Sequence, residues 1–224
     1  MVRDYFELAK PRIIVLLLIT TAAAMVMAAR GIPPLALTFW TLLGGALAAW
    51  LSLCGNVFYV GIYTMWLKRT TPLNIVIGGA AGAVPPLVGW AAVTHQIGGP
   101  ALGLFALIFL WTPPHFWSLA LMTETDYAKA NIPMMPNVAG EERTKREIIY
   151  YTILLVAASL VLYPLHVMGA IYTAAAAVLG AIFLYDTIHT WKDAGTLWAR
   201  RTFKYSLLYL ALMCLVMVID RIVA

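Results

Sequence analysis

Two carboxylates stand directly after a long apolar run, where a membrane protein could hold a metal ion. The run ends at Met122, and Glu124 and Asp126 follow it. Carboxylate oxygens are hard ligands of the kind that Mg²⁺ takes, often together with the phosphate groups of a substrate. The spacing fits an ordinary solvated loop equally well, so both interpretations stay open from the residues alone.

Cationic side chains and one amide could bind the phosphate groups of such a substrate. Lys68 and Arg69 end an apolar stretch just before Asn74, and an arginine fork binds phosphate oxygens in pairs. Arg12 follows Pro11 at the start of an earlier apolar run, which places its guanidinium at the membrane surface. By themselves the residues favour a simpler role for these cations, as positively charged membrane anchors.

A titratable ring lies among aromatic side chains near the end of one apolar run. His115 follows Pro113 and Pro114 and is flanked by Trp111 and Phe116. Backbone inside a bilayer has no water to bond, so a Pro-Pro break at membrane depth survives only where it packs in protein or lines a cavity. The segment is therefore predicted to form the wall of a site, although a packed interfacial histidine is an equally good interpretation.

The elements that must position these residues are membrane-spanning helices. Of the 224 residues 62% are hydrophobic and 11% are charged, which is far from the balance of a soluble protein. Uncharged runs, most of them close to the roughly 20 residues that cross a bilayer, cover 13–29, 35–66, 73–94, 100–122, 148–165, 167–185 and 205–219. We predict an all-α, polytopic membrane helix bundle with about seven transmembrane helices. Lys204 and Asp220 are expected to extend the short last run towards the headgroups.

The basic residues predict the orientation of these helices. If the N-terminus is cytoplasmic, every Lys and Arg except Arg30 and Arg221 lies on the cytoplasmic side. This asymmetry is the positive-inside pattern, and it accounts for the net charge of +5 without any nucleic-acid partner. We therefore expect a multi-pass protein of the cytoplasmic (inner) membrane.

Two long segments resemble one known family. Tyr63–Thr94 (YTMWLKRTTPLNIVIGGAAGAVPPLVGWAAVT) and Phe109–Pro136 (FLWTPPHFWSLALMTETDYAKANIPMMP) are similar to the protohaem IX farnesyltransferases, or haem O synthases. Leu8–Ile13 and Arg200–Asp220 extend the resemblance over nearly the whole chain. It implies a UbiA-type intramembrane prenyltransferase, normally with nine crossings around a cavity open to the cytoplasm. It also implies transfer of farnesyl from farnesyl diphosphate to haem B, giving haem O and diphosphate.

The resemblance gives the candidate residues particular roles. Asp126 matches the second of two acidic motifs that bind Mg²⁺ and the prenyl diphosphate, with Glu124 beside it. Lys68, Arg69 and Arg12 match basic positions, which makes them diphosphate-site candidates together with Asn74. His115 and Tyr127 match positions that line the mouth of the cavity, and haem contact by His115 is a hypothesis.

The first acidic motif of the family has no counterpart in this chain, because no acid occurs between Glu7 and Glu124. Moreover, the run 35–66 would make a helix of about 48 Å, against a hydrocarbon core of about 30 Å. Leu35–Ala49 resembles the start of the family's second helix and Trp50–Trp66 its fourth. We therefore predict a single prenyltransferase-like domain over 1–224 with an internal deletion near 46–56, which turns nine crossings into seven.

Three hypotheses for function follow. The first is a farnesyltransferase of low activity, because half of the Mg²⁺ site is missing; its product would serve haem A synthase or terminal oxidase assembly. The second is a non-catalytic membrane protein, a defective truncated homologue that binds haem or an oxidase-assembly partner. The third is a small transporter, motivated only by prolines within the spans.

Overall fold

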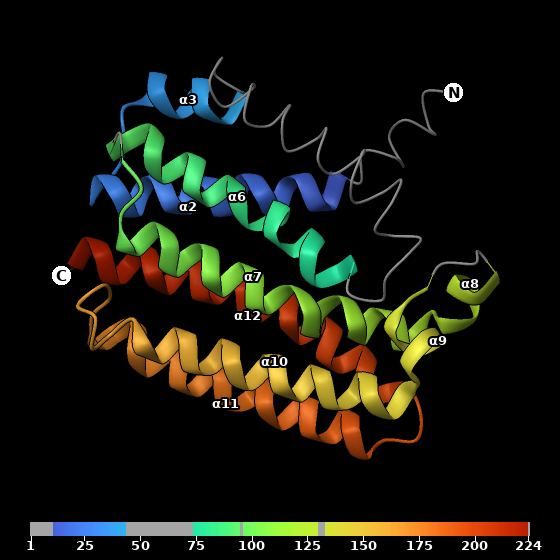
Figure 1. The fold of residues 1–224 in the computed structure, drawn as a ribbon. Coiled ribbons are helices and arrows are strands. Elements are labelled where there is room, and N and C mark those ends of the chain that lie inside the picture. The colour runs from blue at the N-terminus through green and yellow to red at the C-terminus, as the bar shows by residue number, and fades with distance from the viewer. Residues whose placement is uncertain (1–10, 44–73, 95, 130–132, 224) are drawn as a thin grey trace, which may run out of the picture.

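A computed structural model describes residues 11–43, 74–94, 96–129 and 133–223, and the regular structure of these ranges is helical (Figure 1). Its helices are α2 (Pro11–Ala29), α3 (Leu35–Leu43), α6 (Asn74–Thr94), α7 (Gly99–Met122), α8 (Glu124–Lys129), α9 (Met135–Ala139), α10 (Glu141–Val161), α11 (Ala170–Lys192) and α12 (Leu197–Val223). The all-α prediction is confirmed. The predicted junction and deletion near 46–56 lie outside the described residues.

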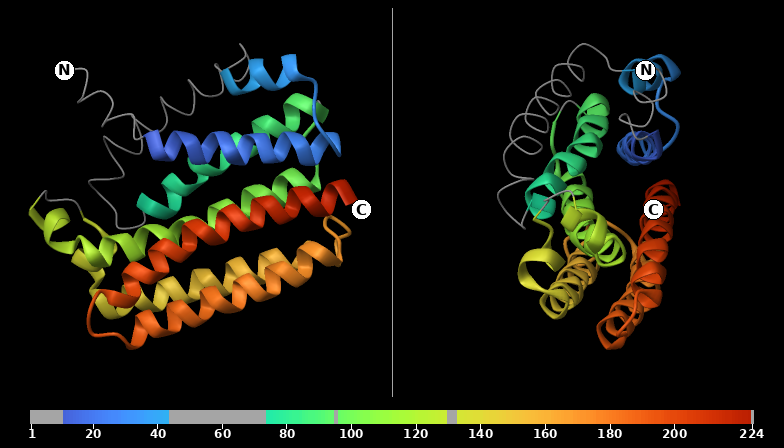
Figure 2. Two further views of the ribbon diagram at one scale, coloured as in Figure 1. Left: turned by 180° about the vertical axis from the view of Figure 1, so that it is seen from behind. Right: turned by 90° about the vertical axis from the view of Figure 1, so that its right-hand side faces the viewer.

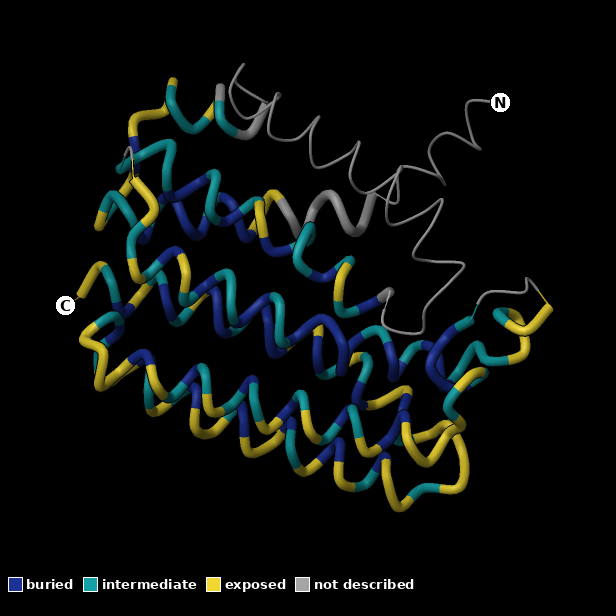
Figure 3. Tube along the Cα trace, in the orientation of Figure 1, coloured by how far each residue is buried: buried dark blue, intermediate teal, exposed yellow. Residues whose placement is uncertain are grey.

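The long helices run side by side, with α7 and α12 in the middle of the bundle (Figures 1 and 2). Helix α7 packs against α6, α10 and α12, and α12 packs against α11, α7 and α2. Most of α7 is therefore buried, whereas α10 and α11 keep an exposed outer side (Figure 3). A residue on α7 or α12 that faces the other helix is thus in the most enclosed part of the protein.

The predicted spans that fall within the described residues correspond to helices, and the charged flanks are helical too; most of the predicted span 35–66 lies outside the described residues. Among the described residues, four helices are long and apolar enough to cross a membrane: Ile75–Thr94, Gly99–Met122, Ala170–Lys192 and Leu197–Val223. Helix α10 begins at Glu141 rather than at Ile148. Its first turns are charged, and Lys145 Nζ lies 2.7 Å from Oε1 of Glu141, which is one helical turn earlier. Such pairs support helix outside the hydrocarbon core, so counting uncharged residues underestimates helix length.

Helix α7 runs through Pro113 and Pro114 without a break, so the predicted interruption of the helix was wrong. Both prolines are buried in protein, as expected for proline at membrane depth. Hydroxyl groups on either side of the prolines bond backbone carbonyls one turn earlier. Thr112 Oγ1 donates to Ile108 O at 2.8 Å, and Ser118 Oγ donates to Pro114 O at 2.7 Å. Close packing and these local bonds let the helix continue.

Charge separates along the bundle in the way the positive-inside rule predicts. The ends that carry α8, α9 and the 193–196 loop lie together, and the 162–169 loop lies at the opposite end (Figure 1). Arg30 lines a pocket with Tyr163 and His166 of that loop region. The described basic residues other than Arg30 and Arg221 belong to the first end: Arg12, Lys129, Arg143, Lys145, Arg146, Lys192, Arg200, Arg201 and Lys204. We therefore assign that end to the cytoplasmic side of the membrane.

Asp220 does not reach towards the headgroups, and that prediction was wrong. It is 1% exposed, and its carboxylate accepts hydrogen bonds from the backbone N–H groups of Gly169 at 2.5 Å and Tyr172 at 3.1 Å. These donors belong to the start of α11, where backbone N–H groups have no partner within the helix. Asp220 thus caps α11 from the neighbouring helix, and its charge meets the positive end of the α11 dipole.

Candidate functional site

The predicted acidic segment forms two short helices, α8 and α9, packed on the cytoplasmic end of the bundle. A group of buried side chains joins them to the long helices, and we call it the cytoplasmic cluster: Ile75, Trp117, Ala120, Leu121, Met134, Met135, Ile148 and Ala199. Met134 and Met135 are each 3% exposed. The methionines of the PMMP sequence therefore anchor the segment that follows α8 to the ends of α6, α7, α10 and α12.

Tyr127 faces this cluster from α8 and is half-buried. Burial raises the pKa of its phenol above the usual value, and a hydrogen bond with Thr123 offsets part of the rise. The hydroxyl is therefore protonated at neutral pH and can donate a hydrogen bond. Tyr127 therefore packs where the ends of several helices meet, and its place at a cavity mouth stays a prediction.

Glu124 and Asp126 do not point the same way. They are two positions apart in α8, and residues at this spacing do not face each other on a helix. Asp126 is exposed, whereas Glu124 is partly covered and its backbone carbonyl accepts a hydrogen bond from Asn137 Nδ2 at 3.1 Å. The two acids lie on one short helix, but their carboxylates are not placed to bind the same metal ion.

The other predicted anion-binding residues are only partly placed. Arg12 is in the first turn of α2 and Asn74 is the first residue of α6, and nothing is described of their side chains. Lys68 and Arg69 lie outside the described residues. Because α6 begins next to Ile75 of the cytoplasmic cluster, Asn74 and Tyr127 belong to the same end of the molecule.

His115 is held in an aromatic stack between α7 and α12. Its ring lies nearly parallel to Trp111, with centroids 4.4 Å apart, and to Phe203, with centroids 4.6 Å apart. Phe116 meets the same ring edge-on at 5.0 Å. The histidine is 7% exposed, so it is a packed residue of the bundle interior and not a ring free in the headgroup layer.

A serine on α12 fixes the proton of this histidine. Ser206 Oγ lies 2.7 Å from His115 Nδ1, and it also donates a hydrogen bond to Phe203 O at 2.7 Å. A hydroxyl has one proton to give, so Ser206 must accept from His115, which places the imidazole proton on Nδ1. The Nε2 atom then keeps its lone pair. Trp111 Nε1 donates to Ser206 O at 2.7 Å, so two side chains of α7 bond to one residue of α12.

Ser206 and Phe203 were not singled out from the sequence. A weak signal existed, because Thr202 and Ser206 are hydroxyl residues one turn apart near the start of an apolar run. Both are fully buried, and Thr202 Oγ1 lies 2.8 Å from Thr190 Oγ1 of α11. Hydroxyl pairs of this kind hold membrane helices together.

The donor set at α8 fits one carboxylate ligand of a magnesium ion. Mg²⁺ in proteins is commonly held by one or two carboxylates, with substrate phosphates and water completing the octahedron. Asp126 is an exposed hard oxygen donor and meets that requirement as a single ligand. In the part of the chain that the structure describes, no three His, Cys, Asp or Glu residues come together as a metal cluster.

Comparison with known proteins places the chain in a family. Residues 45–208 match the model of the UbiA prenyltransferase family. The chain is 43% identical to the protoheme IX farnesyltransferase of Trichodesmium erythraeum, over 97% of this chain and 85% of that protein. It is 44% identical to the proteins of the same name from Synechocystis sp. (97% and 89% covered) and Gloeobacter violaceus (98% and 92% covered).

The fold also matches a solved structure. A chain from work on digeranylgeranylglyceryl phosphate synthase in membranes superimposes with a TM-score of 0.73, and the match covers 100% of this chain and 99% of that chain. The two sequences are 13% identical, so this likeness bears on the fold alone. It supports the all-helical membrane architecture independently of the more similar sequences.

Proposed function

Because the chain belongs to the UbiA prenyltransferase family, and within it to the protohaem IX farnesyltransferases, we propose that it transfers farnesyl from farnesyl diphosphate to haem B, giving haem O and diphosphate. The observation that carries the proposal is an identity of 43% over 97% of the chain to a protein of that name. Fold alone would not carry it, since one fold hosts many reactions.

The cytoplasmic end of the bundle is the proposed diphosphate site. Asp126 stands on α8, Tyr127 packs on the cytoplasmic cluster, and α6 begins beside that cluster with Asn74. Arg12, Lys68 and Arg69 are the cations proposed to bind the diphosphate oxygens. Arginine does so through paired N–H donors and lysine as a point charge.

Asp126 is the proposed ligand of Mg²⁺. When bound with diphosphate, Mg²⁺ supplies positive charge against the negative charge that develops on the departing group. Glu124 is a weaker candidate, because α8 directs it away from Asp126. The role of His115 in haem contact remains a prediction; its geometry supports a positioning role, in which Nδ1 is bonded to Ser206 and Nε2 keeps its lone pair.

We expect turnover to be slow, because the chain supplies one acidic segment where the family has two. No acid occurs between Glu7 and Glu124. The alignment with the Gloeobacter violaceus protein spans 281 positions, more than the 224 residues of this chain, so that relative has residues without a counterpart here. This difference in length supports the proposed internal deletion.

Membranes that contain the protein, supplied with haem B, farnesyl diphosphate and Mg²⁺, should form haem O, measured by liquid chromatography with mass spectrometry. The Gloeobacter violaceus relative is the positive control, and we expect it to be at least about 100-fold faster, since loss of one charge-stabilising group costs about 100- to 1000-fold in rate. Asp126→Ala should abolish the remaining product. Thr125→Ala, an exposed neighbour on α8, is the matched control and should leave the rate unchanged.

The alternative is a non-catalytic protein that binds haem. A saturable change in the haem spectrum without haem O, in membranes where the relative is active, would favour that alternative and overturn the proposed reaction. Product formation at the rate of the relative would instead show that the second acidic segment alone is sufficient. Equal rates for Asp126→Ala and wild type would overturn the metal assignment.

We place the protein in the cytoplasmic membrane, with both substrates reaching it from the bilayer or the cytoplasmic side. The multi-pass architecture is given by its membrane-spanning helices. Haem O made there would be consumed by haem A synthase or by assembly of a terminal oxidase. Recovery of labelled haem O in either protein after coexpression would test that step.

A further inference from the structure

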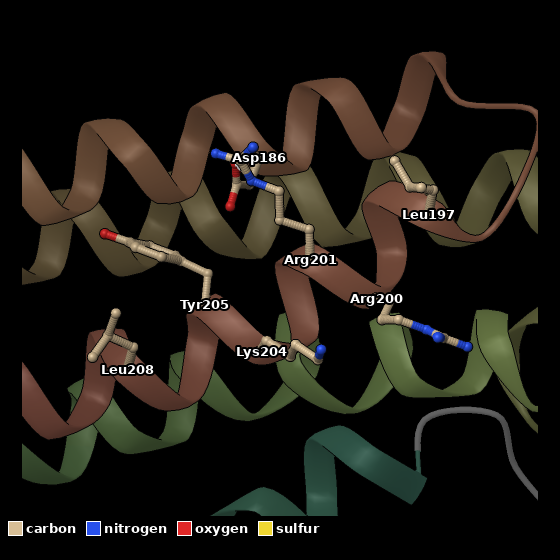
Figure 4. A pocket seen from close by; sticks show the side chains of 7 residues that line it. All are labelled: Asp186, Leu197, Arg200, Arg201, Lys204, Tyr205 and Leu208. Carbon is tan, nitrogen blue, oxygen red and sulfur yellow. Dashed lines mark ion pairs between the residues drawn. The ribbon is translucent and has the colours of Figure 1, made fainter.

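A basic groove lies on the outer side of α11 and α12, near their cytoplasmic ends (Figure 4). Its volume is about 390 Å³, and its lining consists of Asp186, Leu197, Arg200, Arg201, Lys204, Tyr205 and Leu208. Six of the seven residues come from α12, and Asp186 comes from α11. The groove thus combines three cations with apolar side chains along one helix.

This groove is separate from the site around His115. Residues 197, 201, 204 and 208 are three or four positions apart, so they share one side of α12. Ser206, which holds His115, is two positions from both Lys204 and Leu208, and therefore lies on the other side of the helix. Residues 197, 201, 204 and 208 of the groove therefore face away from Ser206 and the His115 ring.

The charges in the groove do not balance. Arg201 Nε lies 3.0 Å from Asp186 Oδ1, and Figure 4 shows the guanidinium reaching across to α11. In the described part of the chain, no ion pair is formed by Arg200 or Lys204, which are both exposed. Among the described residues, the groove therefore carries two positive charges without an acidic partner beside one neutralised pair. A ligand that complements it must be an anion.

The depth of the groove matches the headgroup layer of the membrane. Helix α12 has 27 residues and is about 40 Å long, which exceeds the hydrocarbon core of about 30 Å. Its first turns, with Arg200 and Lys204, can therefore lie among the headgroups. Below them the outer side of the helix pair is apolar and exposed: Val178, Ile182, Tyr185, Leu208 and Leu215. Acyl chains can lie against this surface directly beneath a bound headgroup.

We propose that this groove binds the phosphate headgroup of an anionic phospholipid from the cytoplasmic leaflet. Arg200 and Lys204 contact the phosphate, Arg201 is held in place by Asp186, and the acyl chains follow the apolar side of α11 and α12. Basic pockets between transmembrane helices on the cytoplasmic side bind headgroups in this way. The proposal does not depend on the reaction that the protein catalyses.

Native mass spectrometry of the full chain in detergent tests the proposal, with phosphatidylglycerol and phosphatidylcholine of identical acyl chains as probes. Wild type should retain phosphatidylglycerol in preference to phosphatidylcholine. In the double variant Arg200→Gln/Lys204→Gln, affinity for phosphatidylglycerol should fall about 25-fold, at about fivefold for each cation near the membrane surface. Retention of phosphatidylcholine should not change.

The matched control removes two other cytoplasmic cations, Arg143→Gln/Arg146→Gln on α10, which are 63% and 66% exposed. This control should keep the wild-type preference. Equal retention of phosphatidylglycerol by wild type and Arg200→Gln/Lys204→Gln would overturn the proposal, as would an equal loss in the control. Displacement of the lipid by millimolar inorganic phosphate or diphosphate would assign the groove to a free anion instead. Circular dichroism checks that each variant is folded.

Discussion

The hairpin of α11 and α12 holds a buried carboxylate at each end, and the two are neutralised in different ways. At the cytoplasmic end the Asp186 side chain is 1% exposed and faces Arg201, whose side chain is 55% exposed. At the opposite end Asp220 is also 1% exposed, but its partners are the backbone N–H groups of Gly169 and Tyr172. The charge of Asp186 is thus balanced by a long side chain that water can reach, whereas that of Asp220 is balanced by backbone groups in fixed positions.

This difference predicts which end tolerates change. A backbone N–H at the start of α11 cannot move away. If its acceptor is removed, the donor is therefore left without a hydrogen bond in an apolar environment. A half-exposed guanidinium can exchange its partner for water, so losing this pair should cost less stability than losing the Asp220 cap. The Asp220 end should therefore be the sensitive one.

The largest expected effect is that of Asp220→Ala. It removes the acceptor of two backbone donors at the start of α11, and we expect a loss of about 3 kcal/mol in stability. The measurement is the unfolding midpoint of the purified protein in detergent, followed by circular dichroism. Asp220→Asn keeps one acceptor oxygen, so its unfolding midpoint should lie between those of wild type and Asp220→Ala. A midpoint for Asp220→Ala within 1 °C of wild type would contradict the capping role.

Gly169→Ala should have the next largest effect, a loss of about 2 kcal/mol in stability. A Cβ at this position would lie 2.8 Å from Asp220 Oδ1, so either the carboxylate or the start of α11 must shift. The backbone of Gly169 is extended, with φ −92°, so the cost is steric and not conformational. Gly31→Ala is the control, because a Cβ there meets nothing within 4 Å. Equal midpoints for the two variants would show that the cap is loosely packed.

At the cytoplasmic end, replacing Arg201 should cost more stability than replacing its partner Asp186. Arg201→Gln leaves the buried Asp186 carboxylate without its cation and should cost about 1–2 kcal/mol. Asp186→Asn leaves an exposed guanidinium and should cost less than about 1 kcal/mol. The same midpoint measurement checks the order, and Arg200→Gln controls for the loss of one exposed charge. A larger effect of Asp186→Asn would mean that Arg201 is the less solvated partner.

The smallest effect concerns Asp193, which lies between these helices and is outside the membrane-spanning segments. Hydrogen bonds from the backbone N–H groups of Trp198 and Gly195, both at 3.0 Å, hold the pKa of its carboxyl below the usual value. A lowered pKa means that the stabilisation is complete above about pH 4, the unfolded value, and is lost as the pH falls through the folded pKa.

Wild type and Asp193→Asn should therefore differ in midpoint by a constant amount above about pH 5, and the difference should shrink on acidification below about pH 4. The comparison needs midpoints at several pH values in one detergent. A difference that grows on acidification would reverse the assigned sign.

The all-helical membrane fold and the family could be predicted from the sequence, because apolar composition and long matching segments carry them. The contact of His115 with Ser206 could not, since the two residues are 91 positions apart and meet only through the rotation of α7 and α12. A membrane helix is apolar on all sides, so its pattern does not say which face is buried. The continuity of α7 through Pro113 was missed because packing against neighbouring helices supports it, together with local hydroxyl bonds that the sequence analysis did not single out.

The cap supplied by Asp220 bears on the order in which the chain enters the membrane. Gly169 precedes its acceptor by 51 residues, so α11 is synthesised well before the carboxylate that satisfies its first backbone donors. Until α12 arrives, those donors face the membrane border with water as their partner. Insertion of α11 and α12 as one unit avoids that intermediate, and the residue that completes α11 is then delivered by the helix that follows it.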